Sequence, residues 1–285
     1  MTRKIGLAAL LLTGCVADAG SGGGGDADSD TDVVGDGADS DVDTDSDADT
    51  DADTDSDTGT GSDTSTGDGI TNVNPSGGAG GDIAPGATGM TPLGAEIYVP
   101  TSYDPETLAS PAIWLFNETI DQWRAVADDD AVILVDLHEY NDIPAIVDKI
   151  NESVPILEDE YNVDRARYYW AGWSAGGNIV VIVGSENQAT LAGTMVFPGT
   201  GGNFARDNLE AWDGHKIRMF YACGDQDPNY DYGVPVEAEA NAWADWFGYE
   251  TRFEMVEGSA HYIDEGAYGI RATAWEWMHG FNLGN

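Results

Sequence analysis

Cysteine is nearly absent from this sequence, which holds only Cys15 and Cys223. An internal disulfide framework of the kind that staples small secreted domains is therefore excluded. Cys223 lies in an apolar run, where we expect an inert, buried thiol rather than a partner for Cys15. The apolar run Ile5 to Leu12 is far shorter than the roughly 20 residues that a helix needs to cross a bilayer. We therefore expect no permanent transmembrane helix there.

Positive charge is scarce too, because 11 Lys and Arg residues stand against 52 Asp and Glu residues. The formal net charge is −41, and residues 16–69 contribute 18 Asp and no other charge. When those 18 negative charges and the two positive charges of Arg3 and Lys4 are removed from the total, the remainder of the chain has a net charge of −25. Such a field repels polyanions. Nucleic acid and anionic membrane surfaces are therefore not expected as partners.

The start of the chain reads as a secretion signal. Arg3 and Lys4 precede the apolar run, and small residues lead to Cys15. These small residues resemble the bacterial lipobox, in which the cysteine is acylated and becomes the new N-terminus. We expect a lipoprotein signal peptide over residues 1–15, with lipidated Cys15 as the only link to a membrane, at the outer membrane or cell surface. The alternative is an ordinary signal peptide, which would release the protein in soluble form.

Residues 16–88 are predicted to form a disordered acidic linker. Up to about Gly81 they are almost only Asp, Thr, Ser, Gly and Ala, with no Lys, Arg or aromatic residue. Such a composition cannot build a core. The repeated Asp-x-Asp pattern suggests calcium, but no stretch has the spaced ligands, central Gly and closing Glu of an EF-hand loop. We therefore expect no specific metal site in the linker.

Residues 89–285 are long enough for one domain with a single core. Short apolar runs rich in β-formers alternate with helix-period segments, which is typical of crossover units. We expect an α/β fold with a mostly parallel sheet flanked by helices. Strands are expected at Ala95 to Val99, Ala112 to Phe116, Ala131 to Leu137, Arg167 to Ala171, Gly193 to Phe197, Ile217 to Cys223 and Thr251 to Val256. Helices are expected at Thr119 to Ala127, from Asn141 or Asp142 to Leu157, at Ala175 to Ser185, at Val236 to Phe247 and at Tyr268 to Phe281. Pro155 is expected to kink or shorten the second helix.

A G-x-S-x-G sequence, Gly172 to Gly176, lies between an expected strand and an expected helix. The pattern alone is weak, but this context is the one that a nucleophile elbow requires. Glycine on both flanks permits the sharp turn that exposes the serine hydroxyl above the sheet. We therefore predict that Ser174 is a nucleophile. The alternative is a plain glycine-rich turn with a surface serine.

A serine hydroxyl needs a base, and imidazole suits that task at neutral pH. His261 follows the last expected strand, where a loop can return it to the elbow, and it comes after the serine in the chain order typical of this arrangement. His138 also follows a strand but precedes the serine, so it is the second candidate. The base must in turn be oriented by an acid. Asp227 and Asp225 both follow the sixth expected strand, and we favour Asp227 because Asp225 is placed to shape the turn.

Residues 95–281 resemble the esterase branch of the α/β-hydrolases, which contains polyhydroxyalkanoate depolymerases, feruloyl esterases and acetylxylan esterases. The resemblance rests on Tyr98 to Asp104, Tyr161 to Arg167, the G-x-S-x-G elbow, Gly224 to Asp227, Gly258 to His261 and Trp275 to Met278. In that family the acid is the aspartate that matches Asp227. The resemblance implies a Ser174, His261 and Asp227 triad that cleaves carboxylic esters, small or polymeric, through an acyl-enzyme without a cofactor or metal. A peptidase or thioesterase could use the same residues.

One loop departs from the family pattern. The family usually has a His-Gly pair after its third strand, where this chain has Phe116 to Thr119. That loop normally supplies one backbone donor to the oxyanion, and the amide after the nucleophile, here Ala175, supplies the other. We expect the second donor from the amide of Glu118 or Thr119 or from the Asn117 side chain, and a Glu118 carboxylate near an oxyanion is unfavourable unless it points away. The change also motivates an alternative, a surface-binding lipoprotein that has lost activity.

Trp173 stands directly before the nucleophile and is expected to shape a substrate pocket. A third hypothesis gives the working role to the acidic linker, as a calcium-binding or cell-surface spacer.

Overall fold

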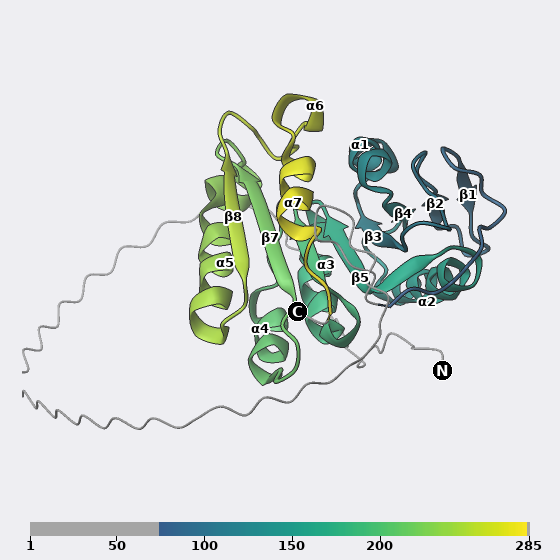
Figure 1. The fold of residues 1–285 in the computed structure, drawn as a ribbon. Helices are drawn as coiled ribbons and strands as arrows, with labels where there is room; N and C mark the ends of the chain where they lie inside the picture. Colours follow the sequence, from purple (N-terminus) through teal and green to yellow (C-terminus); the bar gives the residue numbers. More distant parts are fainter. Residues whose placement is uncertain (1–73, 284–285) are drawn as a thin grey trace, which may run out of the picture. The chain divides into compact units, whose positions relative to one another are not determined.

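The computed structural model describes residues 74–283. The expected signal peptide, Cys15 and the linker as far as residue 73 lie outside these residues. Within the described part of the chain, strands and helices alternate (Figure 1). None of the described helices is both long and apolar enough to cross a membrane.

The eight strands form one sheet in the order β1-β2-β4-β3-β5-β6-β7-β8. The last six strands in this order are mutually parallel, whereas β1 and β2 pair antiparallel at one edge. The expected mostly parallel sheet is confirmed. The strands are β1 (Thr88–Met90), β2 (Glu96–Tyr98), β3 (Ser110–Phe116), β4 (Ile133–Asp136), β5 (Val163–Gly172), β6 (Gly193–Val196), β7 (Arg218–Gly224) and β8 (Thr251–Val256).

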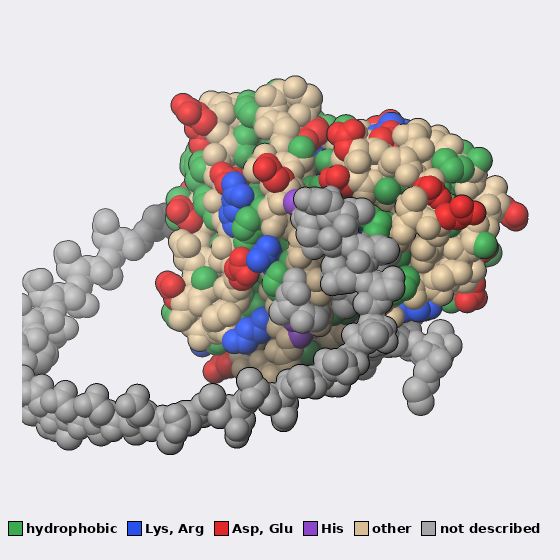
Figure 2. All heavy atoms as spheres, in the orientation of Figure 1, with side chains coloured by type: hydrophobic (Ala, Val, Ile, Leu, Met, Phe, Trp, Pro, Cys, Tyr) green, Lys and Arg blue, Asp and Glu red, His purple; other side chains and the backbone are tan. Residues whose placement is uncertain are grey.

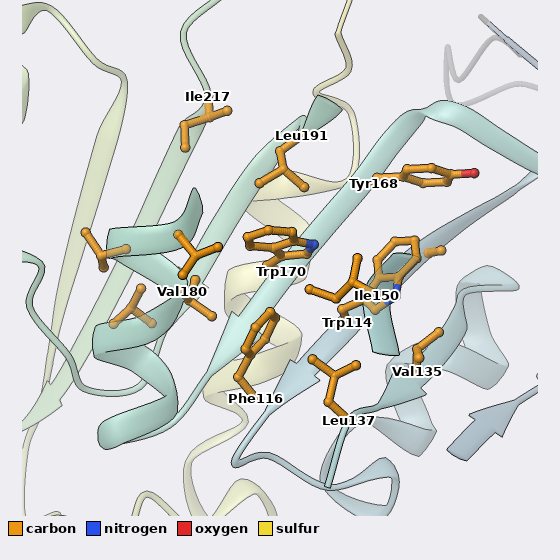
Figure 3. Packing of buried hydrophobic residues seen from close by; sticks show 14 of the residues in the cluster. Trp114, Phe116, Val135, Leu137, Ile150, Tyr168, Trp170, Val180, Leu191 and Ile217 are labelled. Atoms are coloured by element: carbon orange, nitrogen blue, oxygen red, sulfur yellow. The ribbon is translucent and has the colours of Figure 1, made fainter. Parts of the chain in front are cut away.

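Helices cover both faces of the sheet, and a hydrophobic core lies on each side. One core joins the sheet to α2, α3, α4 and α5, and Figure 3 shows its centre around Trp114, Trp170 and Ile150. The other core joins the opposite face to α1 and α7. The helices are α1 (Ile120–Asp130), α2 (Ile143–Glu160), α3 (Ala175–Glu186), α4 (Gly202–Ala211), α5 (Val234–Phe247), α6 (Glu265–Tyr268) and α7 (Ile270–Met278), with 3-10 turns η1 (Gln188–Thr190) and η2 (Pro228–Gly233).

Helix α2 begins where the sequence predicted, because the Asp142 carboxylate accepts a hydrogen bond from the amide of Ala145 and caps the first turn. The helix continues past Pro155 to Glu160, so of the two expected effects of that proline, a kink or a shortening, the shortening does not occur. Ile150 and Leu157 are fully buried in the core on either side of the proline. This burial stabilises the last turns despite the lost backbone hydrogen bond.

One strand, two helices and one domain boundary differ from the sequence-based expectation. Strand β1 and helices α4 and α6 were not expected as separate elements, and α4 begins at Gly202 in the glycine-rich segment 199–203. Residues 74–88 were assigned to the linker, yet the structure places residues 75–83 against the domain. Pro75 forms a β-bridge with Asp164, and the Ile83 amide donates to the Tyr161 hydroxyl. The ordered part of the described chain therefore begins before the expected residue 89.

Cys223 provides a direct test of this core. The thiol is fully buried on β7, and burial, with a smaller effect of Asp227, raises its pKa to about 12. Because the thiolate is the reactive form, we expect Cys223 to react with a disulfide reagent at pH 8 at least about 100-fold more slowly in the folded protein than in guanidinium chloride. The measurement uses a Cys15→Ser chain, in which Cys223 is the sole thiol. Equal rates in the two solvents would contradict the burial.

Candidate active site

The candidate site lies where the parallel strands end. Ser174 follows β5, Asp227 follows β7 and His261 follows β8, while the loop Asn117 to Thr119 follows β3. Carboxyl ends of parallel strands meet at one edge of the sheet, which is where ligands bind in open α/β folds. The topology therefore brings together side chains that are up to 144 positions apart in the chain.

Ser174 sits on a sharp turn between β5 and α3, with φ of 57° and ψ of −119°. This backbone conformation is strained for a residue with a side chain. The flanking glycines make it possible. A Cβ on Gly172 would lie 2.6 Å from the carbonyl carbon of Gly176, and one on Gly176 would collide with the carbonyl oxygen of Phe116. The sequence pattern thus has a steric cause, and the described turn has the form of a nucleophile elbow.

The structure brings the three predicted side chains into one hydrogen-bonded chain. His261 Nε2 lies 2.8 Å from Ser174 Oγ, and His261 Nδ1 lies 2.8 Å from Asp227 Oδ2. The Asp227 carboxylate is fully buried, and its other oxygen accepts the amide of Asn229 at 2.9 Å. An arrangement of this kind fixes the ring so that Nε2 faces the hydroxyl and can remove its proton.

The alternative candidates lie elsewhere. Asp225 accepts the amide of Gly258 at 2.8 Å, so its carboxylate links the acid turn to the loop that carries His261. His138 contacts Glu96 and Asp136, at 3.2 and 3.3 Å. Within the described residues these three side chains bring potential metal-binding atoms within 4.8 Å of one another, although the same atoms already pair with each other.

Two aromatic rings hold the imidazole of His261. The Tyr230 ring stacks on it at 5.8 Å with an interplanar angle of 11°, and the Trp173 ring lies 5.2 Å away. The Tyr230 hydroxyl donates to Asn178 Oδ1 at 2.9 Å and reaches the Ser174 carbonyl at 3.3 Å. The Trp173 indole donates to the His261 carbonyl at 2.9 Å. Sequence reasoning expected Trp173 to contact substrate and missed Tyr230, which no local pattern marked.

The Glu118 carboxylate is turned into the protein. It is fully buried and forms two 2.8 Å contacts with the guanidinium of Arg271, and it accepts the Trp123 indole at 3.1 Å. Burial raises the pKa of Glu118, and the charge and hydrogen bonds of Arg271 oppose that rise. The unfavourable arrangement that the sequence left open, a carboxylate facing the oxyanion, is therefore avoided.

The candidate oxyanion donors can now be compared. The Asn117 side chain donates to the Trp173 carbonyl at 3.1 Å, and the Thr119 amide donates to Gln122 Oε1 at 2.8 Å. These contacts use the Thr119 amide and one of the two N–H groups of Asn117, so among the backbone amides compared in this described loop that of Glu118 is left for a ligand. Ala175 is the first residue of α3, and such an amide has no acceptor within its helix.

A groove of ≈ 390 Å³ adjoins the elbow. Trp173 and Tyr262, the sequence neighbours of Ser174 and His261, form part of its wall, so the groove adjoins the elbow and the loop that carries the base. The remaining lining residues are Asn117, Glu118, Thr119, Gln122, Asp136, His138, Glu139 and Tyr140. Trp173 thus both contacts the base and lines the groove.

Comparison with solved structures now identifies the fold. S-formylglutathione hydrolase (FrmB) from Staphylococcus aureus matches with a TM-score of 0.51 at 14% identity, over 70% of this chain and 99% of that one. The BES protein from Bacillus cereus matches with a TM-score of 0.51 at 11% identity, over 68% of this chain and 92% of that one. The chain has the α/β-hydrolase fold.

A third match is dipeptidyl peptidase 4 from Porphyromonas gingivalis, with a TM-score of 0.51 at 12% identity, over 69% of this chain and 36% of that one. No protein family model matches the sequence, and no curated protein does either. At such low identity the structural matches carry the fold alone.

The buried pair of Glu118 and Arg271 gives a stability prediction. Replacing Arg271 with Met leaves a buried carboxylate without its partner, and we expect a loss of about 3–5 kcal/mol in the free energy of unfolding by urea. The double variant Glu118→Leu with Arg271→Met removes both charges, and it should recover most of that loss. A double variant as unstable as the single one would show that the lost charge partner is not the cause.

The stacked ring of Tyr230 gives a second prediction. Tyr230→Leu removes the ring from the imidazole, and we expect Ser174 to react with a fluorophosphonate about 10- to 100-fold more slowly, because small displacements of a base cost that much. Tyr230→Phe keeps the ring and should cost no more than about fivefold, the effect of one hydroxyl hydrogen bond. The pH profile of labelling distinguishes positioning from general destabilisation. Equal losses in the two variants would contradict the role of the ring.

Proposed function

We propose that this protein is a serine hydrolase that cleaves carboxylic esters. The observation that supports this most directly is the chain of two 2.8 Å contacts from Ser174 through His261 to buried Asp227. The resemblance of residues 95–281 to the esterase branch favours esters as substrates. Small-molecule and polymeric esters both fit this proposal.

In the proposed reaction, the hydroxyl of Ser174 attacks the ester carbonyl while His261 Nε2 takes its proton. The Asp227 carboxylate holds the ring and stabilises the imidazolium that forms. The carbonyl oxygen becomes an oxyanion, which the amides of Ala175 and Glu118 would bind. His261 then gives the proton to the leaving alkoxide, and water releases the acyl group from Ser174 by the same steps.

The buried Glu118 carboxylate weakens the main argument for an inactive binding protein. That alternative rested on the altered loop after β3, where a carboxylate beside the oxyanion would oppose catalysis. The ion pair with Arg271 removes this carboxylate from the site, and the loop retains a backbone amide that can donate. Loss of one donor would cost about 3 kcal/mol in the barrier, which would slow the reaction without abolishing it.

The proposed function includes a location for the protein in the cell. We propose that the mature chain begins at acylated Cys15 and works outside the cytoplasm at the cell envelope, with the lipid as its membrane attachment. An anionic membrane surface would repel the strongly acidic sequence. A lipid is therefore the expected means of attachment.

A fluorophosphonate probe and a panel of short aryl, feruloyl and acetyl-sugar esters test the activity. We expect labelling of the wild-type chain, and we expect Ser174→Ala to abolish labelling and lower kcat/KM by at least about 10⁴-fold, because no other group replaces the nucleophile. Ser102→Ala, an exposed serine remote from the triad in sequence, is the matched control and should keep full activity.

Three results would count against the proposal. Folded wild-type protein that neither reacts with the probe nor cleaves any ester favours the binding protein. Matched anilides cleaved faster than the corresponding esters would favour a peptidase. Faster cleavage of thioesters would favour a thioesterase.

A further inference from the structure

The groove beside the nucleophile carries an uneven set of charges. Its lining residues include the acids Glu118, Asp136 and Glu139 together with His138, but no Lys or Arg. Arg271 compensates Glu118 from within the protein. The carboxylates of Asp136 and Glu139 remain to set the potential of the groove.

Asp136 lies at the end of β4 and is 4% exposed. One carboxylate oxygen accepts the His138 amide at 2.9 Å and lies 3.3 Å from the His138 ring. Burial raises the pKa of Asp136, as expected for a carboxylate that lacks a direct Lys or Arg partner. Lys149 lowers it only from a distance, since its ammonium donates to the Leu137 carbonyl at 2.6 Å. A cation in the groove would therefore stabilise the charged form of Asp136.

Glu139 supplies a second negative charge at a fixed position. Its Oε1 accepts the amides of Tyr140, Asn141 and Asp142 at 2.9, 2.9 and 3.2 Å. These hydrogen bonds lower the pKa of Glu139, so the side chain is ionised at neutral pH. Three bonds to one oxygen hold the carboxylate against the groove wall.

Aromatic rings complete the lining. Tyr140 and Tyr262, which are 39% and 51% exposed, line the groove together with Trp173, the residue before the nucleophile. The faces of such rings attract organic cations, and the attraction adds to that of nearby carboxylates. The charge of the rest of the domain does not offset this preference, because the sequence outside residues 1–69 carries −25. Figure 2 shows Asp and Glu side chains spread over one face of the domain, with Lys and Arg among them.

We propose that the groove binds the positively charged part of an ester substrate, a compact organic ammonium group, through Asp136, Glu139 and the rings of Tyr140, Tyr262 and Trp173. The proposal rests on the proposed esterase function and names its substrate class. The ammonium group can belong to the alcohol or to the acyl part of the ester, since the groove adjoins the elbow without fixing which side of the bond enters it.

Two pairs of esters test the preference on the full chain. Acetylcholine and 3,3-dimethylbutyl acetate share one shape and differ by the charge in the alcohol. Methyl trimethylglycinate and methyl 3,3-dimethylbutanoate do the same for the acyl part. Each kcat/KM is divided by the rate constant for hydroxide hydrolysis, which corrects for intrinsic reactivity. We expect about a tenfold preference for the cation in at least one pair, decreasing as salt is added.

Substitutions identify the groups responsible. In Asp136→Asn with Glu139→Gln the ratio of cationic to neutral ester should fall below about twofold, and Glu139→Gln alone should lower it partly. Glu210 is an exposed acid on α4. Glu210→Gln removes one negative charge, as Glu139→Gln does, and should keep the full ratio. Fluorophosphonate labelling checks that each variant is folded. A ratio below twofold in both wild-type pairs, or one that persists in the double variant, overturns the inference.

A readout without turnover makes the two proposals separable. Tetramethylammonium chloride should slow fluorophosphonate labelling of the wild-type chain more than the same concentration of sodium chloride does, and the double variant should lose this difference. Equal slowing by the two salts contradicts ammonium binding while the nucleophile still labels. Absence of Ser174-dependent labelling contradicts the esterase function itself.

Discussion

A single buried guanidinium joins two loops on which the site depends. Arg271 on α7 contacts both carboxylate oxygens of Glu118 at 2.8 Å, and its Nη1 donates to the Ile263 carbonyl at 3.0 Å. Glu118 belongs to the loop that would supply an oxyanion donor, and Ile263 lies two residues after His261. Both groups are fully buried, so the pair is strongly constrained once it has formed. The ion pair thus relates the position of the base to the position of the oxyanion loop.

The second constraint is steric and lies at the turn that carries Ser174. The left-handed backbone of this residue is held because its amide donates to the Pro198 carbonyl at 2.9 Å and because Gly172 and Gly176 allow the chain to approach itself closely. The surrounding contacts hold this strained conformation in place in the folded protein, so the chain does not have to adopt it at the moment of reaction. The hydroxyl and the first amides of α3 are therefore positioned before any substrate arrives, which is what electrostatic stabilisation of a transition state requires.

Much of this arrangement could be predicted from the sequence, because the information is local. Each of the seven expected strands corresponds to an observed strand, since apolar runs bounded by turn residues determine strands over a few positions. Ser174, Asp227 and His261 were selected because each follows a strand, and parallel strands bring such positions to one edge. The structure places Asp227 rather than Asp225 against His261, but not for the expected reason, because Asp225 accepts the amide of distant Gly258 and Asp227 itself accepts the nearby amide of Asn229.

The parts that were missed depend on contacts between distant residues. Glu118 and Arg271 are 153 positions apart, and nothing in Phe116 to Thr119 reveals where the carboxylate points. The stacking of Tyr230 on His261 depends on η2, whose backbone includes left-handed residues that no propensity predicts. Helix α4 starts with glycines, and its position is set by Glu239, which accepts the amides of Gly201 and Gly202 at 2.7 and 2.8 Å from α5. In each case a tertiary contact decides a structure that the local sequence leaves open.

The acidic groove also affects the release of product in the proposed reaction. Hydrolysis converts a neutral ester bond into a carboxylic acid, which is ionised at neutral pH. The groove that holds Asp136 and Glu139 adjoins the elbow where this charge forms, and its lining contains no Lys or Arg. Like charges at short range repel, most strongly where burial limits the screening by water. The same charges that would attract a cationic group would therefore weaken the binding of the acid product, so substrate selection and product release follow from one electrostatic feature.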